Sequence, residues 1–168
     1  MSAANKGHLQ VVQALLAAGA DPNAKGATFH YGDFSVLTGA LEPENKNWLR
    51  IVDVLIEARA EVNPTGAFSR FPLAHAVEKR SIAMADALLA RGADVNHKNP
   101  AGMTALMVAT VEVSPEMVRY LIGKGADVKA RTGDGETALS LMRQVPEGFK
   151  QQEREDIERI LKQAGADP

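Results

Sequence analysis

A short motif, Gly-Ala-Asp followed by Pro or Val and usually by Asn, recurs along the chain and constrains its fold more than any other feature. Four copies and one altered copy are present, at Gly19–Asn23, Arg59–Asn63 (altered), Gly92–Asn96, Gly125–Lys129 and Gly165–Pro168. The acidic residues of successive copies lie 40, 33, 33 and 40 positions apart. A period of this size, twice lengthened, is typical of a solenoid in which each repeat packs on its neighbours. Such a stack offers an extended surface, so the motif predicts a binding module more readily than a buried catalytic pocket.

Each repeat contains two predicted helices. The longer one precedes the motif and carries two adjacent apolar pairs four residues apart, which in the first copy are Val11, Val12, Leu15 and Leu16. This spacing places both pairs on one helix face, and it recurs at 51–56, 84–89 and 117–122. A shorter helix is expected upstream of each, at Pro72–Val77, Ala105–Val111 and Ala138–Gln144, with a poorer version at Ser35–Leu41. The pattern therefore predicts an all-α stack of antiparallel helix pairs.

The ends of the longer helices carry recognisable signals. Ser114 and Pro115 indicate an N-cap hydroxyl followed by proline at the first helical position, and Ser81 is expected to cap the preceding repeat. Glycines 19, 92 and 125 are expected to end their helices in the left-handed conformation, which costs glycine little. Arg59 replaces this glycine in the altered copy, so we expect strain or a different exit there.

The segments between successive helix pairs are rich in turn-forming residues. We expect Asn63–Gly66, Asn99–Gly102 and Thr132–Gly135 to form extended turns or hairpins that project from the stack, and we call these loops fingers. Two repeats are seven residues longer than the others. One insertion, around 25–47, is rich in aromatic residues, whereas the other, at 145–156, separates the two helices of the last repeat.

Taken together, these motifs resemble the ankyrin repeat family. Residues Gly7–Ala24 resemble the second helix and exit of an ankyrin repeat, and Thr104–Met107 and Thr137–Ser140 resemble the Thr-Pro-Leu-His signature of its first helix. The match extends over nearly the whole chain. The resemblance implies an ankyrin-repeat solenoid of stacked helix-turn-helix units with projecting hairpin or loop fingers. It also implies protein recognition through the fingers and the concave face of the short helices, without catalysis.

We interpret residues 1–168 as a single ankyrin-repeat domain. We divide it into a partial first repeat, a repeat with an insertion, two regular repeats and a C-terminal cap repeat with an insertion, at 1–23, 24–63, 64–96, 97–129 and 130–168. Glu158 and Lys162 replace the second residue of each apolar pair in the last repeat, so we expect nothing to stack beyond it. Residues 1–8 fit the tail of a first helix whose beginning is absent. We therefore expect the chain to be a fragment, with further repeats or another domain upstream.

Composition argues against several classes of function. The 168 residues carry a net charge of −2, which gives no overall attraction to nucleic acid or to an anionic membrane. The chain lacks cysteine, so disulfides and thiolate sites are excluded. No apolar run is long enough to span a membrane and no signal peptide opens the chain, although a leader already removed would leave no trace. We expect a cytoplasmic monomer.

Chemistry at a catalytic or metal site is not indicated. The four histidines are scattered over separate repeats without ligand spacing, and no strand-turn-helix context surrounds any serine. We therefore expect no catalytic residues, no bound metal, no cofactor and no enzymatic activity.

The expected partner is another protein, or another domain of the parent chain. Aromatic and basic side chains in the fingers and along the short helices are the candidate contact residues: Phe29, His30, Tyr31, Phe68, Arg70, His75, Lys79, Lys98 and Arg131. The alternative for the aromatic residues is that they fill gaps in an irregular repeat, and Phe34 and Phe71 are expected in the core. The alternative function for the whole domain is a structural spacer or stabilising domain of a longer chain, with no tight partner of its own.

Overall fold

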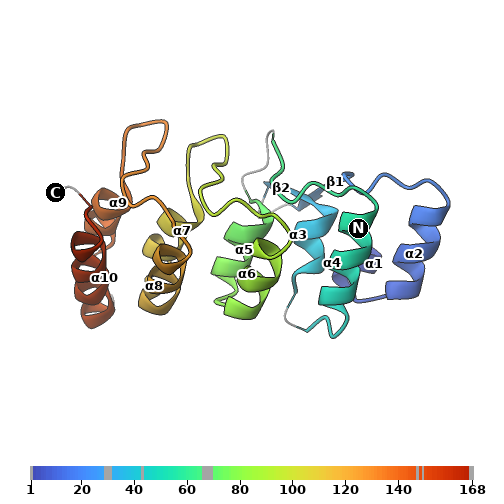
Figure 1. Cartoon of the computed structure of the whole chain (residues 1–168), viewed down its shortest axis with the longest axis horizontal. Helices are drawn as coiled ribbons and strands as arrows, with labels where there is room; N and C mark the ends of the chain where they lie inside the picture. Colours follow the sequence, from blue (N-terminus) through green and yellow to red (C-terminus); the bar gives the residue numbers. More distant parts are fainter. Residues whose placement is uncertain are drawn as a thin grey trace.

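In the computed structural model the chain forms a row of helix pairs that follow one another along its long axis (Figure 1). The structure describes residues 2–28, 32–42, 44–65, 70–146, 148 and 150–166. Within these residues each layer holds one shorter and one longer helix: α1 (Ser2–Asn5) and α2 (Leu9–Ala17), α3 (Val36–Ala40) and α4 (Trp48–Glu57), α5 (Pro72–Glu78) and α6 (Ile82–Leu89), α7 (Ala105–Val111) and α8 (Pro115–Gly123), α9 (Ala138–Gln144) and α10 (Gln151–Gln163). We number these pairs layers 1 to 5. The predicted all-α stack is confirmed.

Three of the shorter helices, α5, α7 and α9, begin where the sequence predicts, whereas α3 lies one residue inside the predicted Ser35–Leu41 at each end. Helices α7 and α9 have the predicted bounds, α5 is longer by Glu78, and the poorer version upstream is α3. Ser35 caps α3, because its hydroxyl accepts a hydrogen bond from the amide of Thr38 at 3.1 Å. Consecutive short helices pack side by side, α3 on α5, α5 on α7 and α7 on α9. Together they form one continuous side of the stack.

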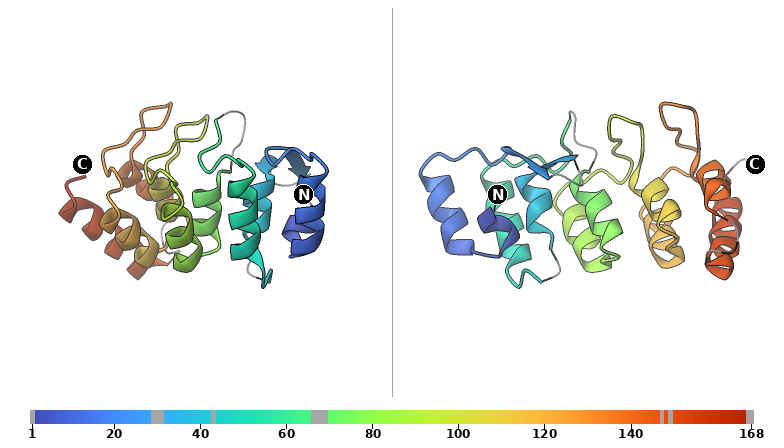
Figure 2. Two further views of the ribbon diagram at one scale, coloured as in Figure 1. Left: turned by 45° about the vertical axis from the view of Figure 1, so that its right-hand side comes forward. Right: turned by 180° about the vertical axis from the view of Figure 1, so that it is seen from behind.

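The fingers project from one edge of the stack (Figures 1 and 2). The first insertion forms a hairpin of β1 (Lys25–Thr28) and β2 (Gly32–Ser35), antiparallel, with Lys25 opposite Ser35. The next two fingers that the structure describes are closed by amide bonds from Asn99 to the Met103 carbonyl and from Thr132 to the Glu136 carbonyl. The predicted turns there are confirmed. Gly66, in the remaining expected turn, lies outside the described residues.

Two of these fingers touch each other. The amide of Gly133 donates to the carbonyl of Ala101 at 2.9 Å. Gly102 adopts a φ of +79°, and a Cβ atom there would lie 2.7 Å from the nitrogen of Gly133. Glycine is therefore required at position 102, both for the turn and for the close approach of the neighbouring finger.

The helix ends follow most of the predicted signals. Ser81 accepts a bond from the amide of Met84 at 3.2 Å, as expected. Ser114 does occupy the N-cap position and Pro115 the first position of α8, but the Ser114 hydroxyl accepts no capping bond from the helix, so that part of the prediction is wrong. Proline already removes one free amide, and Glu116 in the first turn favours the helix dipole. The N-terminus of α8 is therefore stabilised without a capping hydrogen bond from a hydroxyl group.

The exits of the longer helices are left-handed, as predicted. Gly19, Gly92 and Gly125 have φ angles of +84°, +89° and +90°. Arg59 adopts the same conformation at +69°, and the amide of Ala60 bonds to Leu55 just as that of Ala93 bonds to Leu88. Of the two outcomes expected at Arg59, the structure therefore has strain and not a different exit.

The core runs between the layers as a continuous strip. In layers 2 to 4 the first three residues of the apolar pairs are at most 2% exposed: Ile51, Val52, Leu55, Met84, Ala85, Leu88, Met117, Val118 and Leu121. Phe71 is 2% exposed and meets the ring of His97 edge-on at 4.8 Å, which confirms its place in the core. The side chain of Phe34 lies outside the described part of the structure.

The asparagine of the repeated motif links layers 1 to 4 in succession. Asn63 donates from its side chain to the carbonyl of Gly92 and accepts from the amide of Asp94, each at 2.8 Å. The same two bonds run from Asn23 to residues 59 and 61, and from Asn96 to residues 125 and 127. Lys129 occupies the next equivalent position, and its ammonium group cannot accept a hydrogen bond. The motif thus encodes three consecutive junctions of the stack.

Candidate functional site

The surface formed by α3, α5, α7, α9 and the residues next to either end of each helix is called here the short-helix face. A row of five ionisable side chains crosses layers 2 and 3 on it. The neighbouring pairs are Arg70 Nε to Glu78 at 3.0 Å, Glu78 to His75 Nδ1 at 3.6 Å, His75 Nε2 to Glu42 at 3.4 Å, and Glu42 to Lys79 Nζ at 2.7 Å. We call this row the charge line.

His75 lies at the centre of the charge line. Its side chain is only 8% exposed, with a glutamate facing each ring nitrogen. Among the described residues neither nitrogen has a hydrogen-bond partner, because both carboxylates lie within ion-pair distance but outside bonding geometry. The two carboxylates are balanced by Arg70 and Lys79 when the imidazole is neutral. The ends of the line are the accessible part, since Arg70 and Lys79 are 27% and 32% exposed.

An open apolar groove lies further along the same face, between α7 and α9. It has a volume of about 560 Å³ and is lined by Val111, Leu141, Gln144, Val145 and Pro146. Val111 is 44% exposed. We call this hollow the α7–α9 groove.

The exposed valine departs from the pattern of its neighbours. The equivalent positions in the neighbouring repeats, 33 residues before and after Val111, hold the polar residues Glu78 and Gln144. Polar residues are the usual choice at an exposed position. Two basic residues are next to lining residues along the chain or bonded to such a neighbour: Arg143, which is exposed, precedes Gln144, and Arg80 donates at 2.7 Å to the carbonyl of Glu112, which follows Val111. The sequence analysis missed this groove, although a comparison of equivalent positions would have singled out Val111.

The finger residues among the candidates are partly used within the fingers. Lys98 Nζ donates to the carbonyl of Arg131 at 2.9 Å, and Arg131 Nη1 donates to that of Gly135 at 2.8 Å. Both residues remain exposed, and carbonyl bonds leave their charges uncompensated. The other finger candidates, Phe29, His30, Tyr31 and Phe68, lie outside the described residues.

The structure thus sorts the candidates into groups. Arg70, His75 and Lys79 are brought together in the charge line, and Lys98 and Arg131 are brought together at adjacent fingers. His75 is the most buried of these five. A partner on this side would meet the two ends of the charge line and the two fingers before it met the imidazole.

The opposite, long-helix side carries ion pairs that join layers. Asp86 accepts from the Tyr120 hydroxyl at 2.7 Å and lies 2.8 Å from Lys124 Nζ, whose charge also sits 5.3 Å from the centre of the Tyr120 ring. Hydrogen bonds from Lys124 and then Tyr120 lower the pKa of Asp86. Burial, followed by the hydrogen bond to Asp86, raises the pKa of Tyr120. One junction earlier, Arg91 bonds Asp53 at 2.6 Å, so these groups serve to hold layers together.

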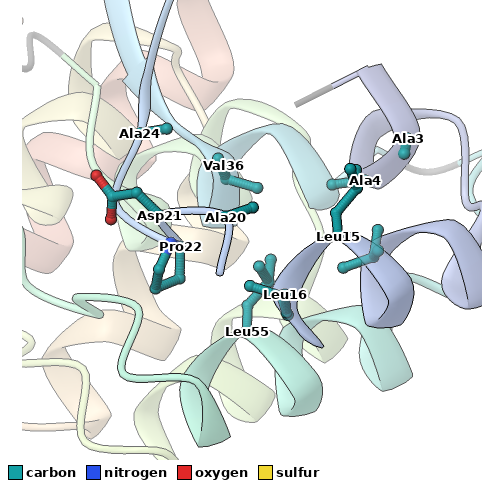
Figure 3. A pocket seen from close by; sticks show the side chains of 11 residues that line it. Ala3, Ala4, Leu15, Leu16, Ala20, Asp21, Pro22, Ala24, Val36 and Leu55 are labelled. Carbon is teal, nitrogen blue, oxygen red and sulfur yellow. The ribbon is translucent and has the colours of Figure 1, made fainter. Parts of the chain in front are cut away.

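A small apolar cavity of about 140 Å³ separates layers 1 and 2 (Figure 3). Its walls are aliphatic and come from both layers, including Ala4, Leu16, Val36 and Leu55. Asp21 also borders it, but the Asp21 carboxylate is used to accept the amide of Asn23 at 2.8 Å. The cavity therefore marks imperfect packing at this junction and offers little to orient a polar ligand.

In the part of the chain that the structure describes, no three His, Asp or Glu side chains are placed to hold a metal ion. The helices of that part are also too short or too polar to cross a bilayer.

Comparison with protein-family models gives two matches. A model of three ankyrin repeat copies matches residues 37–141, and a model of a single ankyrin repeat matches residues 1–27. A search of curated proteins finds no match. Ankyrin repeats are generally protein–protein interaction modules and are typically non-catalytic. The matched ranges cover most of the chain and contain helices α1, α2 and α4 to α8, with the left-handed exits and the asparagine links of layers 1 to 4. The chain therefore belongs to the ankyrin repeat family.

Proposed function

We propose that this domain binds a segment of a partner protein across its short-helix face, with an apolar side chain of the partner seated in the α7–α9 groove. The observation that carries the proposal is the exposure of Val111 beside Leu141, Val145 and Pro146, at a place where neighbouring layers present Glu or Gln. An apolar patch on an otherwise polar face gains free energy when a partner removes it from water.

The charges around the groove define the partner more closely. Arg80 bonds the carbonyl next to Val111, Arg143 precedes Gln144, and Lys98 and Arg131 add positive charge on adjacent fingers. Two acidic residues are exceptions: Glu112, whose carbonyl accepts from Arg80, and Glu136, whose carboxylate accepts a hydrogen bond from the groove residue Gln144. A partner segment with an apolar residue and acidic neighbours would match this arrangement, because rim charges steer association and select the partner.

The contact would extend from the groove toward the charge line. Arg70 and Lys79 stand at its two ends, and the buried His75 lies between Glu42 and Glu78. The aromatic finger residues Phe29, Tyr31 and Phe68, with His30, remain predicted contacts of the same partner.

A displayed library of random peptides tests the proposal. The wild-type chain is used for selection, and enriched peptides are then measured against Val111→Gln, which installs the residue of the next layer. Leu49→Gln is the matched control, because Leu49 is a similarly exposed aliphatic residue, at 40%, on the longer helix α4. We expect affinity to fall about 10-fold or more in Val111→Gln and to stay unchanged in Leu49→Gln.

The two variants separate the possible outcomes. Enriched peptides that bind Val111→Gln as well as wild type would contradict a groove-centred site. A library that gives no specific binder would favour the alternative role of the domain as a structural spacer. Thermal unfolding of both variants checks that the exposed substitutions leave the fold intact.

A further inference from the structure

Helix α10 buries an arginine near its start. Arg154 is only 8% exposed, and no other Arg, Lys, Asp or Glu among the residues that the structure describes is buried. The equivalent place in layers 3 and 4, three residues before the first apolar pair, holds Ser81 and Ser114. A guanidinium group keeps its charge in proteins, so its burial carries a desolvation cost that a group of opposite charge has to offset.

Most of the donors of Arg154 are unused. Nη1 donates to the carbonyl of Pro146 at 3.1 Å, which is the one hydrogen bond of this side chain within the described residues. Nε is buried and has no partner there. Nη2 has no partner in the described part of the chain either, but it is not closed off from solvent.

Two more exposed arginines show what the Nε atom binds elsewhere in this molecule. Arg70 and Arg91, whose side chains are 27% and 26% exposed, have a carboxylate oxygen at 3.0 Å and 2.6 Å from Nε. Acids of α10 close to Arg154 in the sequence serve other groups: Glu155 accepts from Gln151, and Asp156 pairs with Arg159. Within the described residues Arg154 thus lacks the carboxylate that Arg70 and Arg91 each have.

The unpaired guanidinium lies next to the α7–α9 groove. Pro146, whose carbonyl binds Nη1, lines the groove together with Val145. The N-terminus of α10 adds positive potential there, because the N-cap residue Lys150 makes no side-chain capping bond and the first-turn amides point toward the helix start. Glu153, in that first turn, offsets part of this potential.

We propose that Arg154 binds a carboxylate of the partner segment whose apolar side chain occupies the α7–α9 groove. This inference rests on the proposed function. The Nε and Nη2 hydrogens of a guanidinium group point the same way, so one carboxylate accepts both in a bidentate pair. Nη2 is the point of entry, and a side-chain movement of the kind that is common on binding uncovers Nε. Arg154 therefore selects an Asp or Glu close to the apolar residue of the partner.

A double-mutant cycle tests this pair. A peptide enriched in the library selection is compared with its amide analogue, in which Asp is replaced by Asn or Glu by Gln, on the wild-type chain and on Arg154→Met. We expect the analogue to bind about 10-fold or more weakly to the wild-type chain and within about 2-fold of the parent peptide on Arg154→Met. Arg154→Lys keeps the charge without the planar fork and should restore only part of the difference.

Arg143→Met is the matched control, because Arg143 is an exposed arginine on α9, beside the groove residue Gln144. The difference between the acid and the amide should persist in this variant. An equal loss of that difference in Arg143→Met and Arg154→Met would mean that general positive charge attracts the acid, contrary to the proposal. Enriched peptides that carry no acidic residue would also contradict it.

Val111→Gln keeps this inference apart from the proposed function. If Val111→Gln weakens binding while the acid and the amide bind the wild-type chain equally well, the groove stands and the Arg154 pair is wrong. If no peptide is enriched, or if peptides bind Val111→Gln as well as wild type, the proposed function fails and the Arg154 pair fails with it.

Thermal unfolding of the free chain provides a second measurement that needs no peptide. Arg154→Met replaces a buried cation by an apolar side chain, so the melting temperature should stay unchanged or rise by about 2–4 °C. Glu147 follows Pro146, lies outside the described residues, and is the alternative source of a carboxylate within the chain. A fall of more than about 4 °C in both Arg154→Met and Glu147→Gln would show that the chain itself supplies the carboxylate, and would overturn the proposal.

Discussion

At the scale of single residues, strain is concentrated at a few left-handed positions. Arg59, Arg80, Val113 and Lys150 have φ angles of +69°, +52°, +50° and +44°. Arg80 and Val113 occupy equivalent places in the turns between the helices of layers 3 and 4. A residue with a Cβ atom in this conformation costs roughly 1–2 kcal/mol. The surrounding layers hold these turns in place in spite of that cost.

Arg59→Gly restores the residue that the other copies of the motif use. We expect the free energy of unfolding to rise by about 1 kcal/mol, which for a chain of this size raises the melting temperature by about 2–4 °C. Calorimetry measures the change. The control is Arg50→Gly, within α4, which should destabilise because glycine is unfavourable in a helix interior. A lower melting temperature for Arg59→Gly would contradict this expectation. It would mean that contacts of the arginine side chain stabilise the fold by more free energy than the strained backbone costs.

The Asp86–Tyr120 pair gives a pH-dependent prediction. The raised pKa of Tyr120 means that its contribution to stability is complete below the ordinary tyrosine pKa of about 10 and is lost as pH rises through the folded value. The lowered pKa of Asp86 has the opposite effect at acid pH. The contribution of Asp86 to stability is present above its ordinary pKa of about 4 and is lost as the pH falls through the pKa of the folded state.

Absorbance titration in a Tyr31→Phe background isolates the phenol of Tyr120. We expect it to stay protonated through about pH 11 in the folded chain. Asp86→Asn removes the neighbouring negative charge and should lower the midpoint of the titration. An unshifted midpoint in the parent, or no change in Asp86→Asn, would contradict the hydrogen bond between the two side chains.

At the scale of structural elements, the junctions between layers are specific as well as apolar. At three junctions the asparagine of the motif satisfies one carbonyl and one amide of the next exit turn, and ion pairs on the longer helices add a second link at two of them. Asn63→Ala should therefore cost about 1–2 kcal/mol, the net value of two hydrogen bonds.

Urea unfolding of Asn63→Ala checks this estimate. Asn5→Ala is the matched control, since Asn5 is an exposed asparagine outside the motif, at the end of α1. Equal stability of the two variants would mean that the asparagine links add nothing to apolar stacking.

The elements also show which features the sequence could predict. The helix pairs were predictable because their signals are periodic: apolar pairs in the longer helices and a short apolar run after each finger. The missing capping bond at Ser114 depends on local geometry, which residue type alone does not determine. The α7–α9 groove depends on one departure from the repeat pattern, Val111, and on the packing of two helices that are 33 residues apart. The charge line could not be predicted for the same reason. It forms only because Glu42, after α3, packs against α5 of the next layer, and sequence alone does not give that contact.

At the scale of the whole molecule, the structure is a one-dimensional series of layers in which each layer is stabilised by its neighbours. This arrangement leaves the short-helix face and the fingers free to contact a partner. It also predicts unequal local stability. Layer 1 has one described neighbour, an adjoining cavity of about 140 Å³ and two half-exposed apolar residues, whereas layer 4 is packed on both sides.

Native-state hydrogen exchange of the full chain tests this nearest-neighbour organisation most directly. We predict the slowest exchange in α7 and α8, intermediate rates in α5 and α6, and the fastest exchange in α1 and α2, with protection falling layer by layer. Equal protection of α2 and α8, with all layers opening in a single step, would contradict it.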